Sequence, residues 1–198
     1  MITLPKENDF ELTPAGSHVA VCFRVVDQGT QAGSYKGVET HNRKIMIGYE
    51  LPNEKMADGK PFSIFRSFNL SSSKKGNLRP FLESWRGRPF TGEELGKFDI
   101  SRLVGVPALL NVIHETGEDG VTRSNVKSIM GLPKGTPVPE IENEKFCFSL
   151  ETFDPAIFDK LSEKMQEKIK LSPEYQRLFA NGVSKSSAVA SEEEGLSF

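Results

Sequence analysis

Residues 61–90, PFSIFRSFNLSSSKKGNLRPFLESWRGRPF, decide the predicted fold, because within them a strand passes its chain directly to a helix. From Phe62 to Leu70 apolar residues occupy every second position, as they do on the buried face of a strand. Phe65 falls on the opposite face, and Arg66 is the one charged residue on the apolar face. The pattern predicts a strand with one side packed against a core.

The segment after this strand is predicted to be an amphipathic helix. Ser71–Ser73 offers an N-cap and Gly87 ends the helix. Thr91, followed three residues later by Glu94, is typical of a capping box and predicts a second short helix. The apolar residues of the first helix recur at the spacing of one helix face, and they are Leu78, Phe81, Leu82 and Trp85.

More strands are expected on both sides of this unit, at residues 16–26, 43–51, 108–114 and 121–132. Residues 27–42 are rich in Gly and polar residues, which predicts a long loop between the first two strands. Five strands with a helical insert between the third and the fourth are the order of an OB-fold, a five-stranded barrel. The predicted fold class is therefore mainly β: an OB-fold barrel with a helix between strands 3 and 4.

Beyond Leu132 the composition changes to a proline-rich linker, followed by a short strand at 145–150 and helical periodicity at 155–171 and 173–180. The residues of the last segment, 181–198, are small and polar and show no periodicity, which is typical of disorder. We therefore expect three parts: an OB-fold domain at 1–135, a C-terminal extension with helices at 136–180, and a disordered acidic interaction tail at 181–198.

The charge of the chain is unevenly distributed. The net charge is −2, but residues 16–135 hold 17 Lys and Arg against 12 Asp and Glu, a net +5. Residues 136–198 hold 7 against 12, a net −5. A basic core with an acidic appendage indicates nucleic-acid binding and an acidic interaction tail.

Several classes of protein are excluded by the sequence pattern. No apolar run approaches the roughly 20 residues of a membrane span, and the acidic N-terminus lacks the apolar segment of a secretory signal, so we expect a cytoplasmic protein. Cys22 and Cys147 are isolated, which is typical of reduced thiols. His18, His41 and His114 have no metal-ligand spacing, and neither a metal site nor a cofactor is expected.

Aromatic and basic residues on the expected strands are candidates for binding single-stranded DNA, because rings stack on bases and Lys or Arg meet phosphates. Phe65 is the strongest aromatic candidate, whereas Tyr49 shares a face with Ile45 and could instead belong to the core. The DNA-binding candidates are Arg24, Tyr35, Lys36, Arg43, Lys44, Tyr49, Phe65, Arg66, Arg123 and Lys127. A second basic cluster is open to two interpretations, phosphate contact or solvated helix face, and comprises Lys74, Lys75, Arg79, Arg86 and Arg88.

The chain ends in SEEEGLSF, an acidic run that closes on an apolar ring beside its α-carboxylate. Such an ending suits capture by a basic pocket with a hydrophobic floor, although an ordinary charged terminus is the alternative. The predicted partner-binding residues of the tail are Glu192, Glu193, Glu194, Leu196 and Phe198.

Three segments together resemble the phage-encoded single-stranded DNA-binding proteins with an OB-fold: NLRPFLESWRGRPFTGEEL, FDISRLVGVPALLNVIHE and SNVKSIMGLPKG. The resemblance covers about residues 14–135, and FSLETFDPAIFDKL is similar to the C-terminal part of the same family. The tail is similar to those of bacterial and some phage single-stranded DNA-binding proteins, although it lacks the Ile-Pro-Phe ending of the bacterial type. The resemblance implies a replication or recombination accessory protein in the cytoplasm of an infected bacterium, without catalytic residues.

The main hypothesis is a non-enzymatic, sequence-tolerant binder of single-stranded DNA that protects exposed strands and recruits replication or recombination proteins through its tail. A second hypothesis is an OB-fold adaptor that uses its strands for protein partners. A third, a metal-dependent nuclease, needs a cluster of carboxylates around the metal. The available acids occur where helix caps and turns usually have them, at Asp99, Glu115, Glu118 and Asp119. Self-association stays open.

Overall fold

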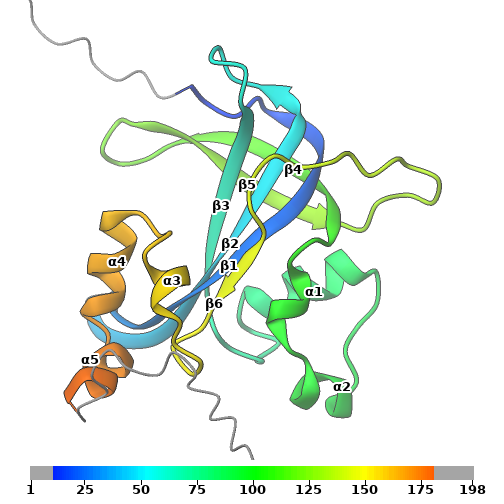
Figure 1. Ribbon diagram of the computed structural model, residues 1–198. Coiled ribbons are helices and arrows are strands. Elements are labelled where there is room, and N and C mark those ends of the chain that lie inside the picture. Colours follow the sequence, from blue (N-terminus) through cyan, green and yellow to red (C-terminus); the bar gives the residue numbers. More distant parts are fainter. Residues whose placement is uncertain (1–10, 181–198) are drawn as a thin grey trace, which may run out of the picture.

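The computed structural model describes residues 11–180, with the exception of the Tyr35 side chain, and it is mainly β (Figure 1). Five strands form an antiparallel sheet in the order β3-β2-β1-β4-β5. Their bounds are β1 Gly16–Tyr35, β2 Val38–Lys55, β3 Pro61–Asn69, β4 Pro107–Thr116 and β5 Thr122–Met130. A sixth, short strand, β6 (Phe146–Phe148), pairs with β1 in parallel.

The helices form two groups at one end of the sheet, with the strands between them (Figure 1). The insert between β3 and β4 contains α1 (Leu78–Arg86), α2 (Gly92–Lys97) and the 3-10 helix η1 (Ile100–Leu103). The C-terminal extension contains α3 (Pro155–Phe158), α4 (Glu163–Lys170) and α5 (Pro173–Ala180). Among residues 11–180, no helix has the length and apolar character needed to cross a membrane.

The sheet is not closed into a barrel by backbone pairing. Within the described chain β3 pairs with β2, and no ladder joins β3 to β5. One side chain spans the opening: the Arg66 guanidinium donates a hydrogen bond to the carbonyl oxygen of Val126 on β5, at 2.6 Å. The mainly β prediction is confirmed, while the barrel itself stays a prediction.

The inner face of the sheet and α1 form the main core, as the alternation in residues 61–90 predicts. Phe68 on β3 packs against Phe81 on α1, with ring centroids 4.7 Å apart. Trp85 is buried and donates its indole N–H to the Pro107 carbonyl at 2.9 Å. Burial of these rings contributes roughly 1.5–3 kcal/mol each and fixes the insert to the sheet.

The ends of the insert helices follow local chemistry with one exception. The capping box of Thr91 and Glu94 is present, and Gly87 takes the left-handed conformation with φ 73°. The N-cap predicted at Ser71–Ser73 is wrong, because α1 begins after Asn77 without a side-chain cap. Those serines instead lie in the turn that leads from β3 to the helix.

The loop predicted at residues 27–42 is also wrong, because this segment forms the outer half of a long β1–β2 hairpin. We call residues 29–42 of this hairpin the hairpin arm. The arm is held by the C-terminal extension: Thr30 donates its N–H and its hydroxyl to the Glu174 carboxylate, at 2.8 and 2.6 Å. Gln31 donates to the Lys168 carbonyl at 3.0 Å. Contacts with distant residues therefore override the local preference of this Gly-rich segment for a loop.

The extension packs on the outer face of β1 and β2 around a second core. Val26 of β1 and Met46 of β2 are buried there with Phe148, Leu150, Phe158, Leu161 and Ile169. The single helix predicted at 155–171 is broken between α3 and α4, which lets both short helices face this core. Gln166 stabilises the break by donating to the carbonyls of Phe158 and Leu161, at 3.3 and 3.0 Å.

Candidate nucleic-acid interface

The edge strand β3 leaves part of the outer sheet face open. Its outward residues, Ser63, Phe65, Ser67 and Asn69, alternate with the buried ones, and we call these four residues the β3 strip. Phe65 is 40% exposed, although its neighbours Ile64 and Phe68 lie in the core. A partly exposed ring on an edge strand is a surface on which a base can stack. The predicted outward direction of Phe65 is confirmed.

The Phe65 ring lies over a glycine and beside a guanidinium. Its partner across the β2–β3 ladder is Gly48, and Gly48 is in turn paired with Arg24 on β1. The Arg24 guanidinium carbon lies 4.5 Å from the Phe65 ring centroid, a cation–π distance. Burial lowers the pKa of Arg24, but an arginine stays protonated in proteins. The structure thus brings two predicted residues, Arg24 and Phe65, into contact.

Replacing Gly48 by alanine is expected to displace the Phe65 ring and to weaken any binding that depends on it. A Cβ built at Gly48 would lie 2.7 Å from Phe65 Cε1 and 3.0 Å from Arg24 Cγ, so the ring must move. We expect G48A to lower the affinity for oligo-dT by several-fold, as measured by fluorescence anisotropy. The loss should disappear in a Phe65→Ala background, and an equal loss in both backgrounds would show that Gly48 acts in another way.

The outer face of β1 and β2 is covered by the extension. At one end, the fully buried Glu50 carboxylate accepts hydrogen bonds from the backbone N–H groups of Glu142 and Asn143, at 2.8 and 2.7 Å. The Asn143 amide adds a third bond at 2.6 Å. At the other end, Met46 is buried in the second core. On this side of the sheet a nucleic acid therefore meets β3 and not the covered face of β1 and β2.

Arg43 is used to hold the extension. Its guanidinium pairs with Asp27 at 2.6 Å and with Glu151 at 2.9 Å. The hydrogen bond to Asp27 raises the pKa of Arg43 further above its already high value. Both carboxylates compete with a phosphate for this guanidinium, and a contact of Arg43 with DNA stays a prediction.

Two DNA-binding predictions are corrected by burial. Tyr49 is fully buried, its ring centroid lies 5.5 Å from that of Trp85, and burial raises the pKa of its phenol well above the ordinary value. Arg66 points inward, where it spans β3 and β5 and lies over the Phe68 and Phe81 rings. Tyr49 cannot stack on a base, and Arg66 stabilises the sheet opening.

The other predicted residues lie apart from the β3 strip. Tyr35 and Lys36 are at the tip of the hairpin arm, about 30 Å along β2 from Gly48 at 3.3 Å per residue. On β5, Arg123 pairs with Asp119 at 2.6 Å, and the Lys127 side chain is exposed. Of the predicted set, Arg24 and Phe65 are in contact, and Lys44 lies on β2 four residues before Gly48, the ladder partner of Phe65.

Two lysines of the extension are absent from the predicted set. Lys164 and Lys168 lie on α4, and the charges of Lys164 and of Lys44 on β2 both lower the pKa of Lys168, after its burial. Their spacing of four residues indicates a shared helix face. The sequence shows that spacing, but only the packing of α4 on the sheet shows which strand the face lies beside.

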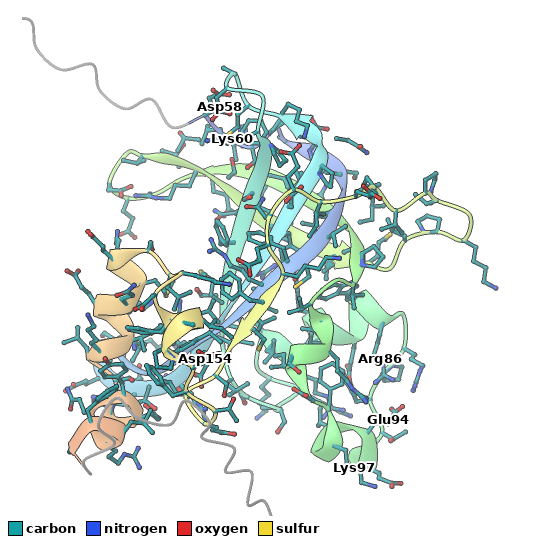
Figure 2. The ribbon with its side chains drawn as sticks, viewed as in Figure 1. Asp58, Lys60, Arg86, Glu94, Lys97 and Asp154 are labelled. Carbon is teal, nitrogen blue, oxygen red and sulfur yellow. The ribbon has the colours of Figure 1, made fainter. Side chains whose placement is uncertain are left out.

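The three arginines of the second basic cluster pair with carboxylates of the insert, which favours the solvated-face interpretation for them. Arg79 pairs with Glu83 at 2.8 Å, and Arg86 and Arg88 both pair with Glu94, at 3.1 and 2.6 Å. Figure 2 shows Arg86 and Glu94 facing each other between α1 and α2. These bonds hold the pKa of the exposed Glu94 carboxylate at about 2.

Three of the four acidic residues considered for a nuclease have structural partners. Asp99 accepts the Ser101 N–H at 2.9 Å, Asp119 pairs with Arg123, and Glu115 accepts the Asn125 amide at 2.7 Å. No group of three His, Cys, Asp or Glu side chains with metal-binding geometry is found in the described part of the chain. The predicted partner-binding residues of the tail, 192–198, lie outside the described residues.

Comparison with known proteins adds no family assignment. The sequence matches no model of a protein family, and a search of curated proteins finds no relative.

Proposed function

We propose that this protein is a non-enzymatic, sequence-tolerant single-stranded DNA-binding protein with an OB-type sheet. The observation that carries the proposal is Phe65: a partly exposed ring on an edge strand, backed by the Arg24 guanidinium, with Lys44 on the neighbouring strand. One stacked base contributes roughly 1–3 kcal/mol regardless of its identity, because every base has a π face. Lysines add phosphate contacts that are equally independent of sequence.

The strand order supports the OB-type fold. The chain runs β1 to β3 as a meander, crosses through the insert, and returns with β4 beside β1. This order leaves β3 and β5 as the two edges, which an OB barrel brings together, and Arg66 already spans them. OB barrels are partly open and use strands 2 and 3 to bind oligonucleotides, which agrees with the position of the β3 strip.

The proposed role follows from the sequence and the resemblance it carries. A protein that coats single-stranded DNA in phage replication or recombination needs affinity without sequence preference and a means of recruiting other proteins. The acidic, Phe-terminated tail suits the second task. We propose the cytoplasm of an infected bacterium as the place of action.

The test is fluorescence anisotropy of labelled oligo-dT and of a duplex of equal length, each titrated with the full-length protein over a series of salt concentrations. We expect tight binding of oligo-dT, much weaker binding of the duplex, and an affinity that falls with salt as counterions are released. Absence of oligo-dT binding at micromolar protein in low salt, with the tail present or removed, would overturn the proposal.

The edge position of β3 favours one alternative, a protein-interaction adaptor. Within the described residues β3 has one ladder partner, so an extended peptide could add to it as a further strand. The two functions respond differently to Phe65, because strand addition depends on the β3 backbone and DNA stacking on the ring. Unchanged oligo-dT binding after Phe65 is truncated would favour the adaptor.

A further inference from the structure

A cluster of three lysines lies where helix α4 of the C-terminal extension packs on β1, next to Lys44 of β2. Lys44 is on β2, and its partner across the ladder is Asn69, the last residue of the strip. Lys164 and Lys168 are on α4, which belongs to the extension and not to the sheet. Two parts of the chain that are far apart in sequence therefore contribute charge to one place.

Packing fixes α4 in this position. Ile169 is fully buried in the second core with Met46, and the ladder partner of Met46 is Ser67 of the β3 strip. The Lys168 ammonium donates to the Gln28 side-chain oxygen at 3.2 Å, and the Lys168 carbonyl accepts from Gln31. The side chain and the backbone of Lys168 thus hold the helix on β1, where Gly29 is the ladder partner of Lys44.

The charges in this cluster repel one another. Burial lowers the pKa of Lys168, and the positive charges of Lys44 and Lys164 lower it further. The nearby carboxylates offset this repulsion only in part: Glu174 is bound to Thr30, and Glu163 precedes Lys164 by one residue and so faces about 100° away around the helix. Glu167 lies three residues after Lys164 on the helix surface and offsets part of its charge. Like charges held together are relieved by binding an anion, so the cluster favours a phosphate.

We propose that helix α4 forms one wall of the DNA-binding groove, with Lys164 and Lys168 joining Lys44 to contact the phosphates of a strand whose base stacks on Phe65. This inference rests on the proposed function and extends it, because it makes the C-terminal extension part of the binding site. The ligand is a single-stranded polynucleotide, since the site combines a ring on which a base can stack with lysines that can contact phosphates. A free phosphate would meet the lysines without the ring.

The test separates charge from stacking through the salt dependence of binding. Lys164→Met with Lys168→Met removes two charges and keeps the aliphatic stems that cover the helix. For single strands each phosphate contact adds about 0.7 to the slope of log affinity against log salt. We expect the double variant to lose about 1.4 from that slope and to bind oligo-dT about 25-fold more weakly at 0.1 M salt, as two such contacts predict.

The matched control is Lys60→Met with Lys97→Met, which changes the net charge equally. Lys60 pairs with Asp58 at 3.4 Å and Lys97 with Glu93 at 2.7 Å, and both lie away from α4 (Figure 2). We expect this control to keep nearly the wild-type slope. Circular dichroism and thermal melting verify that each variant is folded, and Lys164→Met alone, at an exposed position, gives half of the slope change.

Each outcome has a distinct meaning. If the wild-type protein binds oligo-dT but the α4 variant keeps its slope, or if the control loses as much, α4 is no wall of the groove and the proposed function stands. If inorganic phosphate displaces labelled oligo-dT as effectively as unlabelled oligo-dT does at the same concentration of phosphate groups, the cluster is a simple anion site. The inference is then overturned. If the wild-type protein does not bind oligo-dT, the proposed function itself fails.

Discussion

Phe65→Ala is expected to lower the affinity for oligo-dT between about 5-fold and 150-fold, with the salt dependence of binding unchanged. Truncation removes the one partly exposed ring of the β3 strip, and a stacked base contributes roughly 1–3 kcal/mol. Because the variant removes no charge, the number of released counterions stays the same. Anisotropy titrations at several salt concentrations measure both quantities, and Phe65→Trp should restore the affinity.

Phe179→Ala is the matched control for the loss of an exposed ring. Phe179 is 44% exposed, close to the value for Phe65, but its ring packs on Tyr175 at 4.5 Å and lies in α5. We expect this variant to keep the wild-type affinity. Equal losses in both variants would mean that any exposed phenylalanine contributes, and the assignment of Phe65 as the stacking residue would be wrong.

Gly29→Ala is expected to lower the free energy of unfolding by roughly 2–5 kcal/mol. Gly29 has φ 67°, which costs other residues about 1–2 kcal/mol. A Cβ at this position would also overlap the Cβ and Oγ of Ser172 and lie 3.0 Å from Leu150 Cδ1, and overpacking adds about 1–3 kcal/mol. Ser172 is fully buried at the α4–α5 junction and cannot move freely. Urea denaturation measures the loss.

Gly37→Ala separates the two contributions. Gly37 also has a positive φ, 78°, but a Cβ there meets nothing within 4 Å. We expect this variant to lose only the backbone cost of about 1–2 kcal/mol. A loss as large as that of Gly29→Ala would show that the contact between β1 and the extension adds little, whereas a clear difference measures the clash itself.

The strand-to-helix unit at 61–90 could be predicted because its patterns are local. The alternation of β3, the helical spacing from Leu78 to Trp85 and the glycine stop at Gly87 are each decided by a few neighbouring residues. The same holds for the direction of Phe65. Where burial on one face selects a strand or a helix, the sequence alone carries the information.

The hairpin arm and the extension could not be predicted in this way. Residues 27–42 form strands because Glu174 and Gln31 supply hydrogen bonds between β1 and the C-terminal helices. No pattern within the segment shows a partner so far along the chain. The same long-range packing decides that Arg43 meets Asp27 and Glu151, which is why a basic residue that resembles a phosphate contact is an anchor.

The candidate site contains both residues that local patterns predict and residues that only long-range packing explains. Tyr49 lies on the same strand face as Ile45 and Ile47, so the sequence allows two interpretations, a core residue or a base-stacking residue. Its burial decides for the core. Arg66 broke the apolar pattern of β3, and only the neighbouring edge of β5 explains why a charge is accepted there. Lys164 and Lys168 look like ordinary helix charges until the position of α4 is known.

The parallel pairing of β6 with β1 also constrains the order in which the protein can be completed during translation. Val26 of β1 lies opposite Phe148. The second core, to which both residues belong, is complete only when Ile169 of α4 has been added. At about 5–20 residues per second, a ribosome needs roughly 5–25 s to advance from the end of β2 to α4. During that interval the β1–β2 hairpin exposes Val26 and Met46 to water. The nascent chain therefore carries an apolar, aggregation-prone surface that only its last helices cover. Chains released before α4 would keep this surface exposed and become substrates for chaperones and proteases.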